Sequence, residues 1–262
     1  MANTAYENFF LGTIVEDQFN SHLDLARFCT VDTSLQGTAG MKKIINVYSA
    51  TDGTEKLGQG EGNSKSITAG FTQKEYEILL AQNRFEWFDE EAMKDPMLVP
   101  VGMQHAGTDL FNTMNADIFG EFKKGTMTVA ATTPNFDAFV DAIAKMNLEN
   151  DEEVEIFGFV SAKNKAAVRK ALKEDLKYVT EYSRSPAYIG TVAGINLFDK
   201  KDADDGEIIV GTKAAVRLLV KTGTEVEQER DGNTRKNSAF SRKYYVAALD
   251  NDTKVVRITL GG

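Results

Sequence analysis

The stretch from Thr51 to Gly70 constrains the fold of this chain most, because it cannot contribute to a hydrophobic core. Its 20 residues include five glycines and only two large apolar side chains, Leu57 and Ile67. The runs on either side of it, residues 41–48 and 76–87, have the character of strands. We therefore predict one long hairpin over residues 41–88. A two-stranded ribbon is marginal in water by itself, so we interpret this hairpin as an assembly arm that lies on a neighbouring surface.

Composition favours a soluble protein that assembles over one that catalyses. The 262 residues suffice for one large domain or two smaller ones, and they contain no apolar run of membrane-spanning length and no signal-peptide layout at the start. We expect an intracellular product with no membrane partner. The single cysteine, Cys29, excludes an intramolecular disulfide, and with His22 and His105 it leaves too few ligands for a tetrahedral zinc site. His105, without a second ligand nearby, is interpreted as a surface or boundary residue.

The charge balance bears on possible partners. A net charge of −9 is the opposite of the basic excess that supplies non-specific affinity for nucleic acid. The one basic cluster lies on a predicted helix and comprises Lys163, Lys165, Arg169, Lys170, Lys173 and Lys177. Apolar residues alternate with these cations, from Ala166 to Val179, so the cluster is interpreted as the solvated face of an amphipathic helix.

The clearest helix runs from about Pro100 to Phe122. Its apolar residues recur at steps of three and four, and they are Met103, Gly107, Leu110, Phe111, Met114, Ile118 and Phe122. Thr108, Asp109, Asn112, Asp117 and Glu121 form the other face. Pro100 suits a first turn, while Lys123 and Lys124 suit a helix end that Gly125 closes in a left-handed conformation. We expect this helix to face the core.

The remaining segments divide the chain further. Residues 1–40 have no sustained period and are interpreted as an N-terminal arm, with a possible helix over Ile14–Phe28 and a turn over Gly37–Gly40. The acidic link Asp89–Pro96 suits one helical turn. Residues 133–198 are predicted to form a compact α/β subdomain, in which the helix after Pro134 buries one side and residues 154–160 form a strand covered on both faces. That side of the helix comprises Phe136, Phe139, Val140 and Ile143, and short strands are expected at Tyr188–Ile189 and over residues 192–198.

Strands return after the acidic loop Asp199–Gly206. Val216, Leu218 and Val220 alternate with polar residues, and further strand patterns follow around Val226, over 245–249 and over 256–260. We expect these late strands to form a sheet on the Pro100–Phe122 helix. The central subdomain would then be an insertion between the helix and its sheet.

In this order, the elements resemble the major capsid proteins of tailed phages with the Hong Kong 97-type fold over nearly the full chain. The local match is best at Thr224–Asp231, which looks like a strand of the family's peripheral domain, and at the Asp252–Ile258 hairpin. The resemblance implies an α+β fold whose segments we assign as follows: N-terminal arm 1–40, extended β-hairpin loop 41–88, peripheral domain with its spine helix 89–132, axial α/β domain 133–206, and β-strands of the peripheral domain 207–262.

The resemblance also implies a function and partners. The chain would be a structural subunit of hexamers and pentamers in an icosahedral shell around double-stranded DNA, assembled in the host cytoplasm and located in the virion. Scaffolding and portal proteins would be partners, and the packaged DNA would be contacted without sequence-specific binding. Some members begin with a long scaffolding segment, whereas this sequence starts almost at the arm, so a separate scaffolding protein, or none, is expected.

Covalent crosslinking of neighbouring subunits, as in the family's prototype, is not expected. The prototype joins a lysine of the extended loop to an asparagine of the peripheral domain. Lys56 and Lys65 lie on the loop, but no asparagine partner can be matched to them. These lysines are interpreted as solvated or salt-bridging side chains.

Enzymatic interpretations find little support in the same residues. Gly58–Gly62 lacks the Lys-Ser/Thr ending of a phosphate-binding loop. Asp199, Asp202, Asp204 and Asp205 would suit a hard cation, but their spacing does not fit a calcium-binding loop. No Gly-x-Ser-x-Gly motif is present. We therefore predict no enzyme activity, no catalytic, cofactor-binding or metal-binding residues, and no cofactor.

Two alternatives to a phage shell protein stay open. An encapsulin-like nanocompartment shell would share the fold and enclose a cargo enzyme in place of a genome. An acidic metal-dependent enzyme belongs to a different class, and large oligomers on a sizing column would exclude it.

Overall fold

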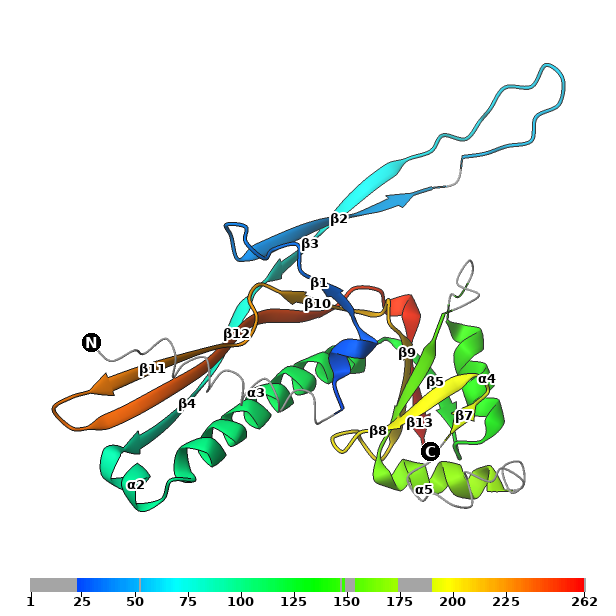
Figure 1. Ribbon diagram of the computed structural model, residues 1–262. Coiled ribbons are helices and arrows are strands. Elements are labelled where there is room, and N and C mark those ends of the chain that lie inside the picture. Colours follow the sequence, from blue (N-terminus) through cyan, green and yellow to red (C-terminus); the bar gives the residue numbers. More distant parts are fainter. Residues whose placement is uncertain (1–22, 52, 147, 149–153, 174–189, 262) are drawn as a thin grey trace.

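The structure is a computed structural model that describes residues 23–51, 53–146, 148, 154–173 and 190–261. In Figure 1 a long hairpin projects from a body that contains two sheets and a long helix. The described elements, in chain order, are η1 (Leu25–Phe28), β1 (Thr30–Asp32), β2 (Lys42–Ala50), β3 (Ala69–Glu77), β4 (Leu79–Phe88), α2 (Asp89–Lys94), α3 (Leu98–Lys123), β5 (Met127–Ala131), α4 (Phe136–Lys145), β6 (Ile156–Val160), α5 (Ala162–Ala171), β7 (Thr191–Val192), β8 (Ile195–Asp199), β9 (Glu207–Thr212), β10 (Val216–Val220), β11 (Glu225–Asp231), β12 (Lys236–Leu249), η2 (Asp252–Lys254) and β13 (Val255–Leu260).

The first sheet is organised around β12. Its strand order is β1-β10-β12-β11, and β4 also pairs with β12. The 14 residues of β12 are enough to hold β11 and β4 along the first part of the strand and β10 along residues 245–249. Helix α3 packs against β12, β4 and β10 and runs along the body of the molecule (Figure 1).

The amphipathic pattern of α3 is confirmed by its burial. All seven predicted apolar positions are buried, and Ala106, Asn115 and Phe119 are buried with them. The helix begins at Leu98 and not at Pro100, which places the proline in the first turn where its missing N–H costs nothing. The acidic link also forms the expected short helix, α2.

The end of α3 differs from the prediction at Gly125. The capping residue Lys124 is right-handed, with φ −75°, and Gly125 is not among the residues of positive φ. A Cβ on Gly125 would lie 2.7 Å from Cγ1 of Val255. Close packing against β13 therefore explains this glycine, and a left-handed helix cap does not.

The second sheet has the order β5-β13-β9-β6-β8-β7. Its strand β6 is almost entirely buried, as predicted for residues 154–160. Asn135 caps α4 by accepting a hydrogen bond from the Ala138 N–H, and Ser161 caps α5 in the same way through Asn164. The predicted buried side of α4 is only partly right: Phe139 is buried, but Phe136 and Val140 are 48% and 42% exposed, because α4 packs through Ala138, Phe139 and Ala142.

Aromatic side chains attach η1 and α3 to the second sheet. Phe28 of η1 contacts Phe157 and Phe159 of β6, with ring centroids 4.8 and 5.3 Å apart. Phe122 of α3 lies 5.7 Å from the same two rings. Since edge-to-face pairs add about 0.5–1.5 kcal/mol beyond their buried area, this cluster holds η1, α3 and the second sheet together.

The hairpin prediction was wrong in its second half. Strand β2 pairs with β3 from Lys42↔Glu77 to Ala50↔Ala69, but β4 leaves the hairpin and pairs with β12. Phe85 and Trp87, which were expected to be hairpin residues, stack on each other in the body at 5.3 Å. Trp87 is buried with Met103 of α3 and Ala239 of β12. Alternation of apolar and polar residues identified the strand but not its partner.

The late strands do not form one sheet on α3. Strands β10, β11 and β12 do, but β9 and β13 pair with β6 and β5 of the second sheet. The expected boundary at Gly206 therefore does not separate the two sheets, and the central segment is not a simple insertion. The buried side chains of β9 and β13 divide between two core clusters, so both faces of these strands are covered in the second sheet.

The expected strand over residues 192–198 is interrupted. Ala193 and Gly194, with φ of 51° and 84°, form a two-residue turn between β7 and β8. Of the helix predicted over Ile14–Phe28, residues 14–22 lie outside the described residues. Its last four residues, Leu25–Phe28, form the short 3-10 helix η1. Tyr188, Ile189, Lys177 and Val179 also lie outside the described residues.

Candidate assembly surfaces

The hairpin arm, defined as β2, β3 and residues 51–68 between them, extends away from the body (Figure 1). Several of its apolar side chains face solvent: Phe71 is 70% exposed, Ile67 64%, Ile44 57% and Leu57 47%. Among its described side chains, none belongs to the hydrophobic core clusters of the body. Exposed apolar side chains along a protruding ribbon mark an interaction surface.

The loop of the arm has a structure of its own. The carboxylate of Glu55 accepts hydrogen bonds from the Ser64 N–H and hydroxyl at 2.9 and 2.8 Å, and Asn63 donates to the Gly53 carbonyl at 3.2 Å. A Cβ on Gly53 would lie 2.7 Å from Cγ1 of Ile67, so only glycine fits there. These contacts tie the two sides of the loop together.

The glycine-rich turn of this loop does not suit a phosphate. The Gly58 N–H donates to Oε2 of Glu61 at 2.8 Å, so a carboxylate of the loop itself takes the place of an anion. Gly60, with φ +87°, forms the turn between them. The loop lysines Lys56 and Lys65 are exposed beside it.

A cluster of charges joins the arm to the body. Lys43 of β2 forms an ion pair with Asp32 at the end of β1, and Arg217 of β10 lies between Asp32 and Asp250. Burial alone would raise the pKa of Asp32, but hydrogen bonds from Lys43 and Ser34 more than offset this and hold it well below its usual range. The hydrogen bond from Arg217 to Asp250 raises the pKa of the guanidinium.

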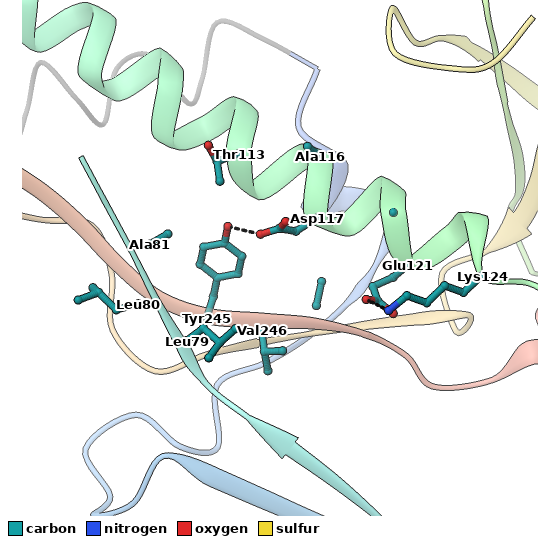
Figure 2. Close-up of a pocket in the computed structure, with 12 residues that line it drawn as sticks. Leu79, Leu80, Ala81, Thr113, Ala116, Asp117, Glu121, Lys124, Tyr245 and Val246 are labelled. Atoms are coloured by element: carbon teal, nitrogen blue, oxygen red, sulfur yellow. Dashed lines mark hydrogen bonds and ion pairs between the residues drawn. The ribbon is translucent and has the colours of Figure 1, made fainter. Parts of the chain in front are cut away.

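A groove of about 510 Å³ lies between α3 and the first sheet (Figure 2). Leu79 and Leu80 of β4 form one wall and are 65% and 47% exposed. Small residues of α3, Ala116 and Gly120, lie on the other wall, and a Cβ on Gly120 would meet nothing within 4 Å. The groove therefore offers apolar surface with room beside it.

The polar groups of the groove are bonded within the chain. The Tyr245 hydroxyl donates to Oδ2 of Asp117 at 2.7 Å, as Figure 2 shows. Glu121 accepts from the Leu249 N–H at 3.1 Å and pairs with Lys124 at 2.5 Å. Burial and then the hydrogen bond to Asp117 raise the pKa of Tyr245. The acid and base groups of the groove thus take part in structural contacts between α3 and the first sheet.

The acidic loop does not gather its carboxylates around one point. Asp199 pairs with Lys165, Asp202 with Lys200, and Asp204 with Lys123. Asp205 accepts from the Ser161 hydroxyl at 2.9 Å. Within the described ranges, no cluster of three or more metal-ligating side chains is present. The loop therefore links α3, α5 and β8 through ion pairs.

The other residues singled out in the sequence occupy unremarkable positions. Cys29 is buried, and burial raises the pKa of its thiol to about 12. His105 is exposed on α3, and His22 lies outside the described residues. In α5, Asn164 and Val168 are buried under the lysine-rich face. None of the helices that the structure describes has the length and apolar character of a membrane span.

Sequence reasoning missed two polar residues that organise the body. Asn115, 4% exposed, accepts from the Leu25 N–H and donates to the Leu23 carbonyl, which attaches the start of the described chain to α3. Arg217 was seen only as the polar position of an alternating strand. A polar residue within the apolar stripe of a helix was the available signal for Asn115, whereas Arg217 had none.

No family model matches the sequence. The major capsid protein of Staphylococcus phage phiMR11 is 24% identical over 256 residues, which span 96% of this chain and 92% of that protein. Among solved structures, the mature capsid of bacteriophage PhiM1 has a TM-score of 0.71 at 12% identity, covering 91% of this chain and 87% of that one. The capsid of cyanophage P-SCSP1u has a TM-score of 0.69 at 12% identity, covering 89% and 86%.

A virus-like particle from Pyrococcus furiosus has the same fold, with a TM-score of 0.65 at 12% identity and coverage of 96% of this chain and 99% of that one. The similarities to solved structures show the fold. The similarity in sequence, to a phage major capsid protein, extends along nearly the whole chain. Together they confirm the resemblance of this chain to the major capsid proteins of tailed phages with the Hong Kong 97-type fold.

Proposed function

We propose that this protein is the structural subunit of a phage capsid, in which many copies assemble into an icosahedral shell around double-stranded DNA. The hairpin arm carries this proposal. It extends beyond the core of its own chain and exposes apolar side chains such as Ile44 and Ile67, which belong to none of the core clusters that the described residues form. The full-length similarity to a phage major capsid protein supports the same function.

The segments of the fold have corresponding roles in this proposal. Residues 1–40 are the N-terminal arm, apart from β1, which belongs to the first sheet; the hairpin arm is the extended loop, and α3 is the spine helix. The first sheet, with α3, is the peripheral domain, and the second sheet, with α4 and α5, is the axial domain. Because β5, β9 and β13 belong to the second sheet, the axial domain includes them in addition to the residues between 133 and 206, and β5 is removed from the segment 89–132 that was assigned to the peripheral domain.

Assembly in this proposal rests on geometry and interface energy. A net charge of −9 keeps separate subunits apart in solution. Contacts that are individually modest become strong together once each subunit is bound to several neighbours. Such a subunit acts as a building block and needs no catalytic residue; its partners are further copies of the chain, with scaffolding and portal proteins, and its final location is the virion.

Electron microscopy of the purified protein, with and without candidate scaffolding protein, tests the proposal. Closed shells of uniform size are expected, assembled from hexamers and pentamers. A species that stays monomeric under all these conditions and turns over a substrate would overturn it.

A cargo-enclosing nanocompartment is the second candidate. It is kept because the chain also shares its fold with a virus-like particle from Pyrococcus furiosus. The contents of shells isolated from the native source distinguish the two functions. Double-stranded DNA protected from nuclease supports the phage capsid, and a co-purified cargo enzyme without DNA supports the nanocompartment.

A further inference from the structure

The hairpin arm is attached to the body mainly through polar contacts. Tyr76 and Ile78 at its base are buried, but none of the described side chains of β2 or β3 belongs to the three core clusters. The Lys74 amine donates to the main-chain carbonyl of Asp250 at 2.6 Å, and the Tyr76 hydroxyl donates to Oδ1 of the same residue at 3.3 Å. On the other strand of the arm, Lys43 binds Asp32 and the Ser34 hydroxyl. Lys43, Lys74 and Tyr76 of the arm thus meet the body at Asp32, Ser34 and Asp250, while Lys221 of the body binds the carbonyls of Thr38 and Gly40 just before the arm begins.

Arg217 connects Asp32 and Asp250. Its Nε and Nη2 donate to Oδ2 of Asp250 at 3.0 and 2.6 Å, and its Nη1 donates to Oδ2 of Asp32 at 3.3 Å. Arg217 sits on β10, whose neighbours are β1, which ends at Asp32, and β12, which ends just before Asp250. The body therefore holds the guanidinium in place from both sides.

The three charged side chains of this cluster are partly shielded from water, which strengthens the hydrogen bonds between them. The side chains of Asp32, Asp250 and Arg217 are 12%, 22% and 27% exposed. Hydrogen bonds in which both partners are charged are stronger than neutral ones, and the planar fork of an arginine fixes the direction of each bond. A lysine ammonium is a single point charge and does not bridge two carboxylates in this planar manner.

We propose that Arg217 is a positioning residue that sets the direction of the hairpin arm, by holding Asp32 and Asp250 where Lys43, Lys74 and Tyr76 can bind them. The arm of one subunit then points at a defined place on the next. This inference rests on the proposed function and deepens it, because the direction of the arm determines where it meets the neighbouring subunit.

A distance measurement on the unassembled subunit tests the positioning directly. Spin labels are placed on Gln73→Cys of β3 and Asp141→Cys of α4, both at exposed positions, while Cys29 is buried and stays unlabelled. Electron-electron double resonance is expected to give a narrow distance distribution for this doubly labelled chain. With Arg217→Gln added, the distribution is expected to broaden several-fold while the circular dichroism spectrum stays the same.

Two further variants keep the test sharp. Lys43→Met removes a contact from the arm side alone, so a broader distribution there cannot come from damage to β10 or β12. Arg242→Gln is the matched control, because Arg242 is an arginine of the same sheet that pairs with Glu225 and Glu227 on β11, away from the arm. Its distance distribution is expected to equal that of the parent. Unchanged distributions in both Arg217→Gln and Lys43→Met would overturn the positioning role.

The consequence for assembly is measured separately. At equal protein concentration, Arg217→Gln is expected to give several-fold fewer closed shells than the parent, and Arg242→Gln is expected to give the same number. If the parent itself forms no shells, the proposed function fails, while the distance measurement still decides whether Arg217 positions the arm. An Arg217→Gln chain with a broad distance distribution but a normal yield of shells would overturn the link between arm direction and assembly.

Discussion

The phenol of Tyr245, on β12, donates a hydrogen bond to Oδ2 of Asp117, on α3, at 2.7 Å. Tyr245 is only 4% exposed, and its raised pKa keeps the phenol protonated as a donor over the whole physiological range. This bond fastens the long helix to the central strand of the first sheet beside the groove of Figure 2. Tyr245 and Asp117 are 128 residues apart in the sequence, so this hydrogen bond forms only when the helix and the sheet have packed together.

We predict that Tyr245→Phe lowers the free energy of unfolding by about 1–2 kcal/mol. The ring stays in place, but a hydrogen bond to a charged acceptor is lost, and Asp117 is exposed enough to be rehydrated. Urea unfolding followed by circular dichroism measures the change. Tyr244→Phe is the matched control, since adjacent residues of a strand point to opposite faces. Equal stabilities of the two variants would show that the bond contributes nothing.

Two glycines of α3 are expected to respond in opposite directions to alanine. A Cβ on Gly120 meets nothing within 4 Å, so Gly120→Ala should stabilise the isolated subunit by about 0.5–1 kcal/mol through helix propensity. A Cβ on Gly102 would lie 2.2 Å from Cζ of Phe85, so Gly102→Ala should destabilise it by about 1–3 kcal/mol through overpacking. Thermal melting of both variants checks the signs. A stabilised Gly102→Ala chain would contradict the packing of β4 on α3.

Replacement of Asp52–Ser66 by Asn-Gly should leave a folded subunit that fails to assemble or forms unstable shells. The described hydrogen bonds of these residues stay within the arm, so the melting temperature is expected to change little. Electron microscopy and sizing chromatography measure assembly. A control with the same 15 residues replaced by a Gly/Ser sequence of equal length separates the need for these side chains from the need for reach. Normal particles from the shortened chain would sink the assembly role of the loop.

The sequence was sufficient to predict those elements whose structure depends on local periodicity. The apolar stripe from Met103 to Phe122 predicted α3 and its buried face, because the residues on one face of a helix recur every three to four positions. Strand partners were a different matter. Phe85 and Trp87 follow the hairpin directly, yet β4 pairs with β12, about 150 residues away, because its apolar face is needed against Met103. Alternation specifies a face and carries no information about the neighbour.

The candidate surfaces, too, were predictable from the sequence only in part. The inability of residues 51–70 to form a core was visible in composition, and so was the need for a partner. The cluster around Arg217 was not visible, since Asp32, Arg217 and Asp250 are far apart in sequence and each occurs in an ordinary strand or turn context. Only the parallel pairing of β1 with β10 brings the first two together.

The attachment of the arm should weaken in acid, and Asp32 should account for part of the loss. Its pKa is held below the usual range by Lys43 and Ser34, against the opposing effect of burial, and Arg217, with Asp250 beyond it, faces the same carboxylate. A carboxyl with a depressed folded pKa contributes its full stability above its unfolded pKa of about 3.9. That contribution is lost as the pH falls toward the folded pKa.

We therefore expect the protection of β2 and β3 amides from hydrogen exchange, in the unassembled subunit, to fall between about pH 5 and pH 2 relative to the amides of β6. In Asp32→Asn the protection of the arm should already be lower at pH 7, and its further decrease in acid should be smaller. Glu229→Gln removes a carboxylate from β11, away from the arm, and should follow the parent at every pH. Parallel pH curves for the parent and Asp32→Asn would show that Asp32 does not carry the acid response.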